Sequence, residues 1–175
     1  MRKEVMQTEE LKLSLELINN WISLADSKAT FLLTITTFFL SASIFALPNI
    51  HKSIIEYLQY PSVLLSTSCI IILTLYFSSS LLSLLSLIQV IKPRLKKIGK
   101  KTSLLYFMDI SNMEIEEYQK ELMSLSNGQL KEHMIGQIYA NSQVAKKKYE
   151  NLDTAINFLV ASLVTGLLLM IVSIK

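Results

Sequence analysis

Residues 29–47, ATFLLTITTFFLSASIFAL, contain no Asp, Glu, Lys, Arg or His. A helix rises about 1.5 Å per residue, so a run of this length can cross a hydrocarbon core about 30 Å thick. Two further uncharged runs follow at residues 63–91 and 154–174. Together with a composition that is 51% hydrophobic, these runs predict an all-α integral membrane protein with three transmembrane helices.

The distribution of Lys and Arg predicts the orientation of the spans. Eleven Lys or Arg residues lie within residues 92–153 and four within residues 1–28, whereas residues 48–62 contain only Lys52. Because positive residues are retained on the cytoplasmic side, we expect a multi-pass protein of the cell membrane with a cytoplasmic N-terminus. Residues 48–62 would then form a short outer loop, and residues 92–153 a cytoplasmic helical segment.

Apolar residues near the N-terminus recur at helical spacing. Thr8 can cap a helix, and Glu9 and Glu10 suit its first turn. The apolar residues that follow at intervals of four and three are Leu11, Leu15, Ile18, Ile22 and Ala25. This pattern predicts an amphipathic helix over residues 8–28 that continues into the first span. We expect it to pack with residues 92–153 in a cytoplasmic helical bundle.

The segment after the second span contains several distinct pieces, and Pro93 favours a break before them. In order they are a basic stretch, RLKKIGKK, at residues 94–101, an apolar-aromatic patch, LLYFMDI, at residues 104–110, a short helix expected over residues 114–125, and a break at Asn127-Gly128. No proline follows this break. We therefore predict one long helix from Gln129 to the C-terminus, cytoplasmic in its first half and membrane-spanning in its second.

Small and hydroxyl-bearing residues form one face of each predicted span. These faces are Thr30, Thr34, Thr37 and Ser41 in the first span, Ser79, Ser83 and Ser86 in the second, and Ser162 and Gly166 in the third. Within a membrane, contact of such residues with protein or water is favoured over contact with lipid. Three helices of one protomer cannot enclose a useful pore, so the hydroxyl faces either line a pore shared by several copies or pack helices together within a protomer. Ser162 and Gly166 give a surface for close helix contact.

Asp26 and Lys28 lie at the threshold of the first span. Two residues apart in a helix, they point about 200° away from each other and cannot form a simple surface pair. In one interpretation Lys28 reaches lipid phosphates and Asp26 meets water or a neighbouring lysine. In the other, both contact the cytoplasmic segment or a ligand held there, because a charge at the membrane edge is costly.

The long predicted helix carries Gln137, Asn141 and Lys148 on one face, with Tyr149 beside it. Two amides, an ammonium group and a ring suit the base edge, ribose and phosphate of a nucleotide. They equally suit a solvated face with a buried tyrosine, which the spacing alone favours. Lys146, Lys147 and Lys148 together are also typical of a contact with anionic lipid.

Sequence motifs give no support for catalysis. The chain has no Gly-rich phosphate loop, no G-x-S-x-G and no H-E-x-x-H motif, so we predict no catalytic residue and no enzyme activity. The single cysteine, Cys69, excludes an intramolecular disulfide, and His51 and His133 have no second ligand at metal-binding spacing. We expect no metal and no cofactor, and the net charge of +3 is too small to favour a nucleic acid polymer.

An ordered set of motifs resembles the Pycsar effector domain family. NWISLADSKATFLLT (20–34) is similar to the family's opening tryptophan, its Ala-Asp-Ser/Thr-Lys-Ala core and its first membrane helix. The later pieces, in the family's order, are KPR (92–94), SLLYFMDI (103–110), EEYQKEL (116–122) and QIYANSQVAKKKYENLDTAINFLVASLVTGLLL (137–169). The resemblance covers about residues 18–169. One position departs from it, because the family patch commonly has a glycine where this chain has Met108.

The resemblance implies a bacterial antiphage effector of the inner membrane. Such an effector is activated by cyclic UMP or cyclic CMP made on infection and damages the lipid bilayer, so that the cell dies by abortive infection. It also implies that residues 92–153 act as the sensor and that several copies form a homo-oligomer. The candidate nucleotide-binding residues are Asp26, Lys28, Phe107, Asp109, Gln137, Asn141, Lys148 and Tyr149. The open alternative is a small scaffolding membrane protein that recruits a cytoplasmic partner.

Overall fold

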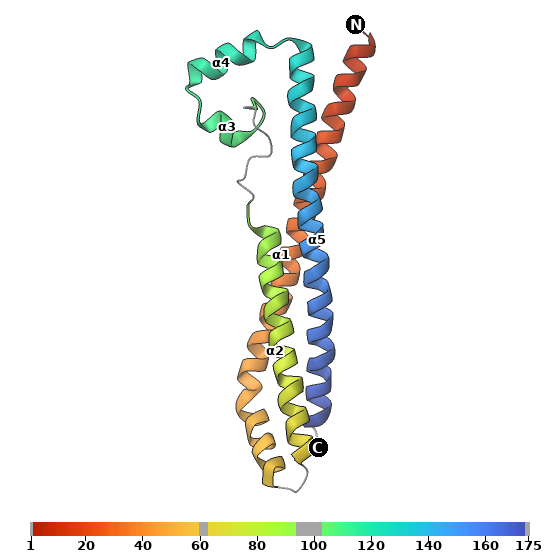
Figure 1. The fold of residues 1–175 in the computed structure, drawn as a ribbon, viewed down its shortest axis with the longest axis vertical. Coiled ribbons are helices and arrows are strands. Elements are labelled where there is room, and N and C mark those ends of the chain that lie inside the picture. Colours follow the sequence, from red (N-terminus) through yellow and green to blue (C-terminus); the bar gives the residue numbers. More distant parts are fainter. Residues whose placement is uncertain (1, 60–62, 94–102, 174–175) are drawn as a thin grey trace. The chain divides into compact units, whose positions relative to one another are not determined.

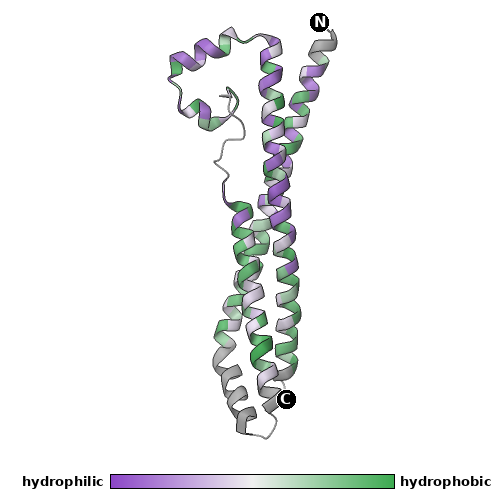
Figure 2. Cartoon of the chain, in the orientation of Figure 1, coloured by the Kyte–Doolittle hydropathy of each residue, from purple (hydrophilic) through white to green (hydrophobic). Residues whose placement is uncertain are grey.

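The computed structural model describes residues 2–59, 63–93 and 103–173, and the regular structure within these ranges is helical (Figure 1). The helices are α1 (Arg2–Gln59), α2 (Val63–Ile91), α3 (Phe107–Ser111), α4 (Ile115–Ser124) and α5 (Asn127–Ser173). Helices α1, α2 and α5 are each long and apolar enough to cross a membrane. Hydrophobic residues cover α2 and the second half of α5, whereas the first half of α5 is mostly hydrophilic (Figure 2). The predicted all-α class and the three candidate spans are therefore confirmed.

The chain divides into two compact units. The first, which we call the polar unit, comprises Met1–Ala25 and Lys92–Lys148; the second, the membrane unit, comprises Asp26–Ile91 and Tyr149–Lys175. The divisions fall within a few residues of the ends of the uncharged runs in the sequence. Tertiary contacts and hydropathy thus divide the chain into a polar part and an apolar part at nearly the same positions. The basic stretch at residues 94–101 lies outside the described residues.

In the polar unit the first part of α1 packs beside the first part of α5. Lys131 Nζ donates to Gln7 Oε1 at 3.3 Å, and Asn141 Nδ2 donates to Asn19 Oδ1 at 2.7 Å. Because both pairs follow the same order along the two helices, the helices run parallel. On α1, the less exposed side is the apolar face predicted from the sequence, and it ends at the fully buried Ala25.

A capping box sets the start of α5. The backbone N–H of Ser126 donates to Gln129 Oε1 at 2.9 Å, and the backbone N–H of Gln129 is 3.3 Å from Ser126 Oγ. These reciprocal bonds satisfy amide groups that a helix N-terminus leaves without intrahelical partners. The break predicted at Asn127-Gly128 is therefore close to the true start, but Ser126 and Gln129 cause it, and Gly128 lies inside the first turn.

Two prolines differ in their effect on helix length: α2 ends just before Pro93, whereas α1 continues through Pro48. Helix α2 ends at Ile91, because Pro93 disfavours the helical conformation at Lys92. Helix α1 instead continues through Pro48 to Gln59, so residues 48–59 of the expected outer loop are helical. A proline removes one backbone donor and crowds the preceding turn, and a long helix without glycine on either side of Pro48 tolerates this local loss.

Close contacts between helices hold the membrane unit together. Ser83 Oγ, which is fully buried on α2, donates to the backbone carbonyl of Ala155 on α5 at 2.9 Å. A Cβ added at Gly166 would lie 3.1 Å from Cε2 of Tyr76, so the ring of Tyr76 packs directly on the backbone of α5. The Tyr76 hydroxyl is hydrogen-bonded to Ser43 on α1. Small residues thus allow close approach, as is typical of helices in lipid.

Candidate functional site

Buried and half-buried residues recur along α5 at intervals of four and three, and we call this series the α5 seam. Its members are Met134, Ile138, Asn141, Ala145, Lys148, Leu152, Ala155, Leu159, Ser162, Gly166 and Leu169. Such spacing is typical of helices that pack side by side over many turns. Three members, Asn141, Lys148 and Ser162, are polar, and polar groups inside such a seam carry a cost in stability.

Lys148 is the most unusual of the candidate residues. Its side chain is only 4% exposed, whereas the neighbouring Lys146 and Lys147 are exposed. Removing an ammonium group from water is expensive unless other groups compensate, and Lys148 does interact with at least one other group. A buried cation on a mostly apolar seam is a group to which an anion can bind if the covering side chains move.

Two turns earlier on α5, the predicted amides form a chain with a third amide from α1. Gln137 Nε2 donates to Asn141 Oδ1 at 3.0 Å, and Asn141 Nδ2 donates in turn to Asn19. Asn19 was not predicted from the sequence, because helical periodicity shows which face is buried but not which residue lies across from it. The amide chain links α1 to α5 within the polar unit, so the amides are already engaged before any ligand binds.

The aromatic patch of the polar unit is built around Asp109. This carboxylate is 9% exposed, and its Oδ2 accepts a hydrogen bond from the backbone N–H of Ser103 at 2.7 Å. Phe107 is exposed and meets the ring of Tyr106 edge to face, with centroids 5.1 Å apart. Among the described residues the buried Tyr106 hydroxyl has no hydrogen-bond partner, a feature that residue spacing does not indicate. Met108 lies within α3, a backbone conformation that does not require glycine.

The remaining three candidates belong to the membrane unit. Asp26 is half-buried, Lys28 is exposed, and Tyr149 is half-buried. The different exposure of Asp26 and Lys28 follows from their position on different sides of one helix. The structure therefore places five candidates in the polar unit and three in the membrane unit. Of the eight, it joins Gln137 to Asn141 by a direct side-chain hydrogen bond.

The hydroxyl faces of the first two spans, alike in sequence, differ in the structure. Thr30, Thr34, Thr37 and Ser41 on α1 are all exposed. On α2, Ser79 and Ser83 are buried and Ser86 is half-buried. Ser162 on α5 is buried as well. The α2 and α5 faces are thus used in packing within one protomer, whereas the α1 face lies on the outside of the protomer.

The described residues contain no group of three His, Cys, Asp or Glu side chains that could hold a metal ion. With three candidate spans and a polar helical unit, the fold defines a multi-pass, all-α membrane protein. The chain belongs to the Pycsar effector protein domain family, PycTM, whose family model matches residues 10–174. A search of the curated proteins and a search of the solved structures each returned no match. Membership of this family implies an antiphage membrane effector with a cyclic nucleotide activator. PycTM is not a known enzyme family.

Proposed function

We propose that this effector binds cyclic UMP or cyclic CMP through its polar unit and responds by rearranging or oligomerising so that the bacterial inner membrane loses its integrity. The N-terminus and residues 92–153 face the cytoplasm, where the nucleotide is made. The observation that carries the proposal is Lys148, a buried lysine on the same helix face as a chain of amides. Infection would then end in death of the cell before the phage matures.

The chemistry of the ligand matches the residue types in the polar unit. A cyclic pyrimidine nucleotide has one negative charge on its phosphate, which the ammonium group of Lys148 would neutralise. The amides of Gln137 and Asn141 offer both donors and acceptors to a pyrimidine edge. Phe107 supplies a ring for stacking, and Asp109 would orient a lysine or the ribose.

Because Lys148 is buried, binding of a nucleotide to it would be coupled to a conformational change. A phosphate can reach a side chain that is 4% exposed only if the groups covering it move. A ligand shifts a conformational equilibrium by its difference in affinity for the two states. A nucleotide that binds the opened seam better than the closed one would therefore drive the opening. The amide chain from Gln137 to Asn19 would have to exchange partners in the same step.

The effect on the membrane requires several copies of the chain. In such an assembly the exposed Thr30 and Thr37 on α1 are available to line a path for water, because the α2 hydroxyl face is buried or half-buried within its own protomer. Ions crossing along this path would dissipate the membrane potential.

Nucleotide binding tests the proposal directly. The purified protein in detergent is titrated with cyclic UMP, cyclic CMP and cyclic AMP, and the titration is repeated with Lys148→Met and with Lys147→Met as the matched control. Methionine retains the apolar stem of lysine and removes the charge. We expect saturable binding of one cyclic pyrimidine that Lys148→Met weakens at least tenfold and Lys147→Met leaves unchanged. Lys28→Ala separates the contribution of the second candidate cation.

Absence of saturable binding to all three nucleotides would refute the proposal, provided that circular dichroism shows the protein to be folded. One observation would then favour the scaffolding alternative. Helix α4 has no buried residue, and Ile115 and Met123 on it are 72% and 77% exposed. An unpacked amphipathic helix of this kind is suited to the recruitment of a partner protein.

A further inference from the structure

Helix α1 has a second stripe of residues at intervals of four and three, and we call it the outer seam. Its members are Leu13, Leu17, Asn20, Leu24, Ser27, Phe31, Thr34, Phe38, Ser41 and Phe45. All of them are exposed. This stripe lies on a different side of α1 from the half-buried face that ends at Ala25. Helix α1 thus has one face packed within the protomer and another that is not covered.

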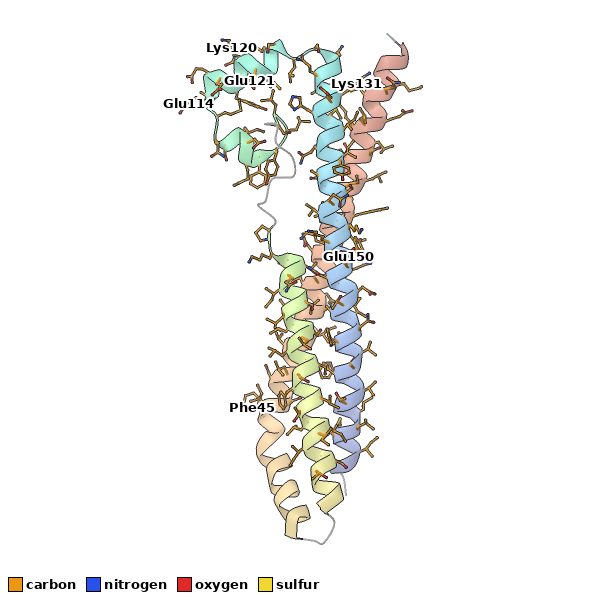
Figure 3. All side chains as sticks on the ribbon, viewed as in Figure 1. Phe45, Glu114, Lys120, Glu121, Lys131 and Glu150 are labelled. Atoms are coloured by element: carbon orange, nitrogen blue, oxygen red, sulfur yellow. The ribbon has the colours of Figure 1, made fainter. Side chains whose placement is uncertain are left out.

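Large apolar residues recur every seven positions along this stripe. The series is Leu17, Leu24, Phe31, Phe38 and Phe45, with exposed fractions from 48% to 85%. Phe45 points away from the neighbouring helices (Figure 3). The alternate positions hold Leu13 and then small or polar residues, which let two helix backbones approach closely. A strict seven-residue repeat of apolar positions is the pattern that places one helix against another over several turns.

The two parts of the outer seam have different surroundings. Phe31, Phe38 and Phe45 belong to the uncharged run, where lipid tails can cover them without any protein partner. Leu13, Leu17 and Leu24 belong to the polar unit and alternate with charged residues such as Lys12 and Glu16. In the cytoplasmic placement proposed above, lipid tails do not cover that segment, and three leucines of one stripe exposed to water are a favourable surface for association.

Only some partners can cover both parts. A soluble protein could cover Leu13, Leu17 and Leu24 but not the phenylalanines of the span. Lipid could cover the phenylalanines but not the leucines. The partner must itself continue from the polar side into the membrane with the same repeat, and α1 of a second copy of the chain has this property.

We propose that two copies of this chain pair in parallel through the outer seam of α1. All copies insert in the same orientation, so the pair is symmetric and each residue of the seam lies near its own equivalent in the partner. Asn20 is the polar member of the seam in the aqueous part, and one polar core residue favours a single register. This pairing would contribute to the assembly step of the proposed function. It does not itself depend on that function, because it does not require a nucleotide to be bound.

Disulfide crosslinking of single-cysteine variants tests this pairing in native membranes. The background is Cys69→Ala, which removes the one native thiol. Leu17→Cys and Phe38→Cys place a thiol on the seam in the polar unit and in the membrane unit. Lys12→Cys is the control, since Lys12 is exposed on the same helix but lies about 100° around it from Leu13. Circular dichroism of each variant confirms that it folds.

Under mild oxidation we expect a crosslinked homodimer from both seam variants, at a yield several times that of Lys12→Cys, whether or not a cyclic nucleotide is added. Yields at Leu17→Cys and Phe38→Cys no higher than at Lys12→Cys, with and without cyclic UMP and cyclic CMP, would overturn the proposal. A crosslink from Leu17→Cys to a protein of another mass would also overturn it. Failure of nucleotide binding would leave this result unaffected, so the two proposals are tested separately.

Discussion

Two glycines of α5 provide a matched test of the packing in the membrane unit. A Cβ added at Gly136 would meet nothing within 4 Å, whereas a Cβ at Gly166 would lie 3.1 Å from Cε2 and 3.4 Å from Cδ2 of Tyr76. Replacing glycine by alanine at an unstrained helical position stabilises a protein by about 0.4–1 kcal/mol, mainly by restricting the unfolded chain. Gly136→Ala should gain this stabilisation in full.

At Gly166 the same gain is opposed by overpacking. Carbon atoms prefer a separation of about 3.5–4.0 Å, so the ring of Tyr76 would have to move by several tenths of an ångström. The ring is not free to move, because its hydroxyl is hydrogen-bonded to Ser43 and lies 3.3 Å from the carbonyl oxygen of Phe39. Overpacking typically costs about 1–3 kcal/mol. We therefore expect Gly166→Ala to lower the free energy of unfolding by about 0–2.6 kcal/mol, the remainder after the helical gain.

Thermal unfolding in detergent micelles, followed by circular dichroism, measures both effects. For a chain of this size 1 kcal/mol corresponds to a change in Tm of about 2–4 °C. The variants should therefore shift Tm in opposite directions, or leave Gly166→Ala unchanged while Gly136→Ala gains. In a Tyr76→Leu background, Gly166→Ala should become stabilising, since the ring atoms are gone. If Gly166→Ala raises Tm as much as Gly136→Ala in the native background, the packing of Tyr76 on α5 is wrong.

Substitutions at three positions test individual hydrogen bonds. Ser126→Ala removes the cap of α5 and should cost about 1 kcal/mol, seen as faster hydrogen exchange in the first turn of α5; unchanged exchange there would contradict the capping box. Ser83→Ala removes the bond to the Ala155 carbonyl and should lower stability by about 0.6 kcal/mol, the average for such bonds in membranes, and a Tm equal to that of the native protein would argue against the bond. Asp109→Ala leaves the backbone N–H of Ser103 without its acceptor, at a cost of about 1–3 kcal/mol, and should speed limited proteolysis around α3. Asp109→Asn, which keeps an acceptor oxygen, should be milder, and equal effects of the two changes would speak against this contact.

Features that depend on local periodicity could be predicted from the sequence. The three apolar runs, the buried side of the first part of α1 and the short helix α4 all follow from which residues recur at helical spacing. Partners across helices could not be predicted in the same way. Nothing in the pattern around Asn19 indicates Asn141 as its partner, and nothing around Gly166 indicates Tyr76. Periodicity specifies one face of one helix, whereas a contact depends on the register of two.

The candidate site shows the same division. Lys148 was singled out from the sequence by its face, but its burial depends on neighbours that spacing does not identify. The helical course of residues 48–59 could not be predicted because Pro48 is a break signal in most contexts. The capping box at Ser126 and Gln129 was available as an S-x-x-Q pattern, and the adjacent Asn127-Gly128 was the more conspicuous signal.

The threonine and serine hydroxyls on the outer face of α1 each donate to a carbonyl about one turn earlier in the same helix. Thr30 bonds to Asp26 at 2.9 Å, Thr34 to Thr30 at 3.1 Å, and Ser41 to Thr37 at 2.8 Å. Each hydroxyl therefore has its acceptor within its own helix, and contact with lipid or with another helix leaves no donor unsatisfied. Rotation about a single side-chain bond can redirect the same hydroxyl to water. This face can therefore exchange an apolar neighbour for an aqueous one without breaking a bond between helices.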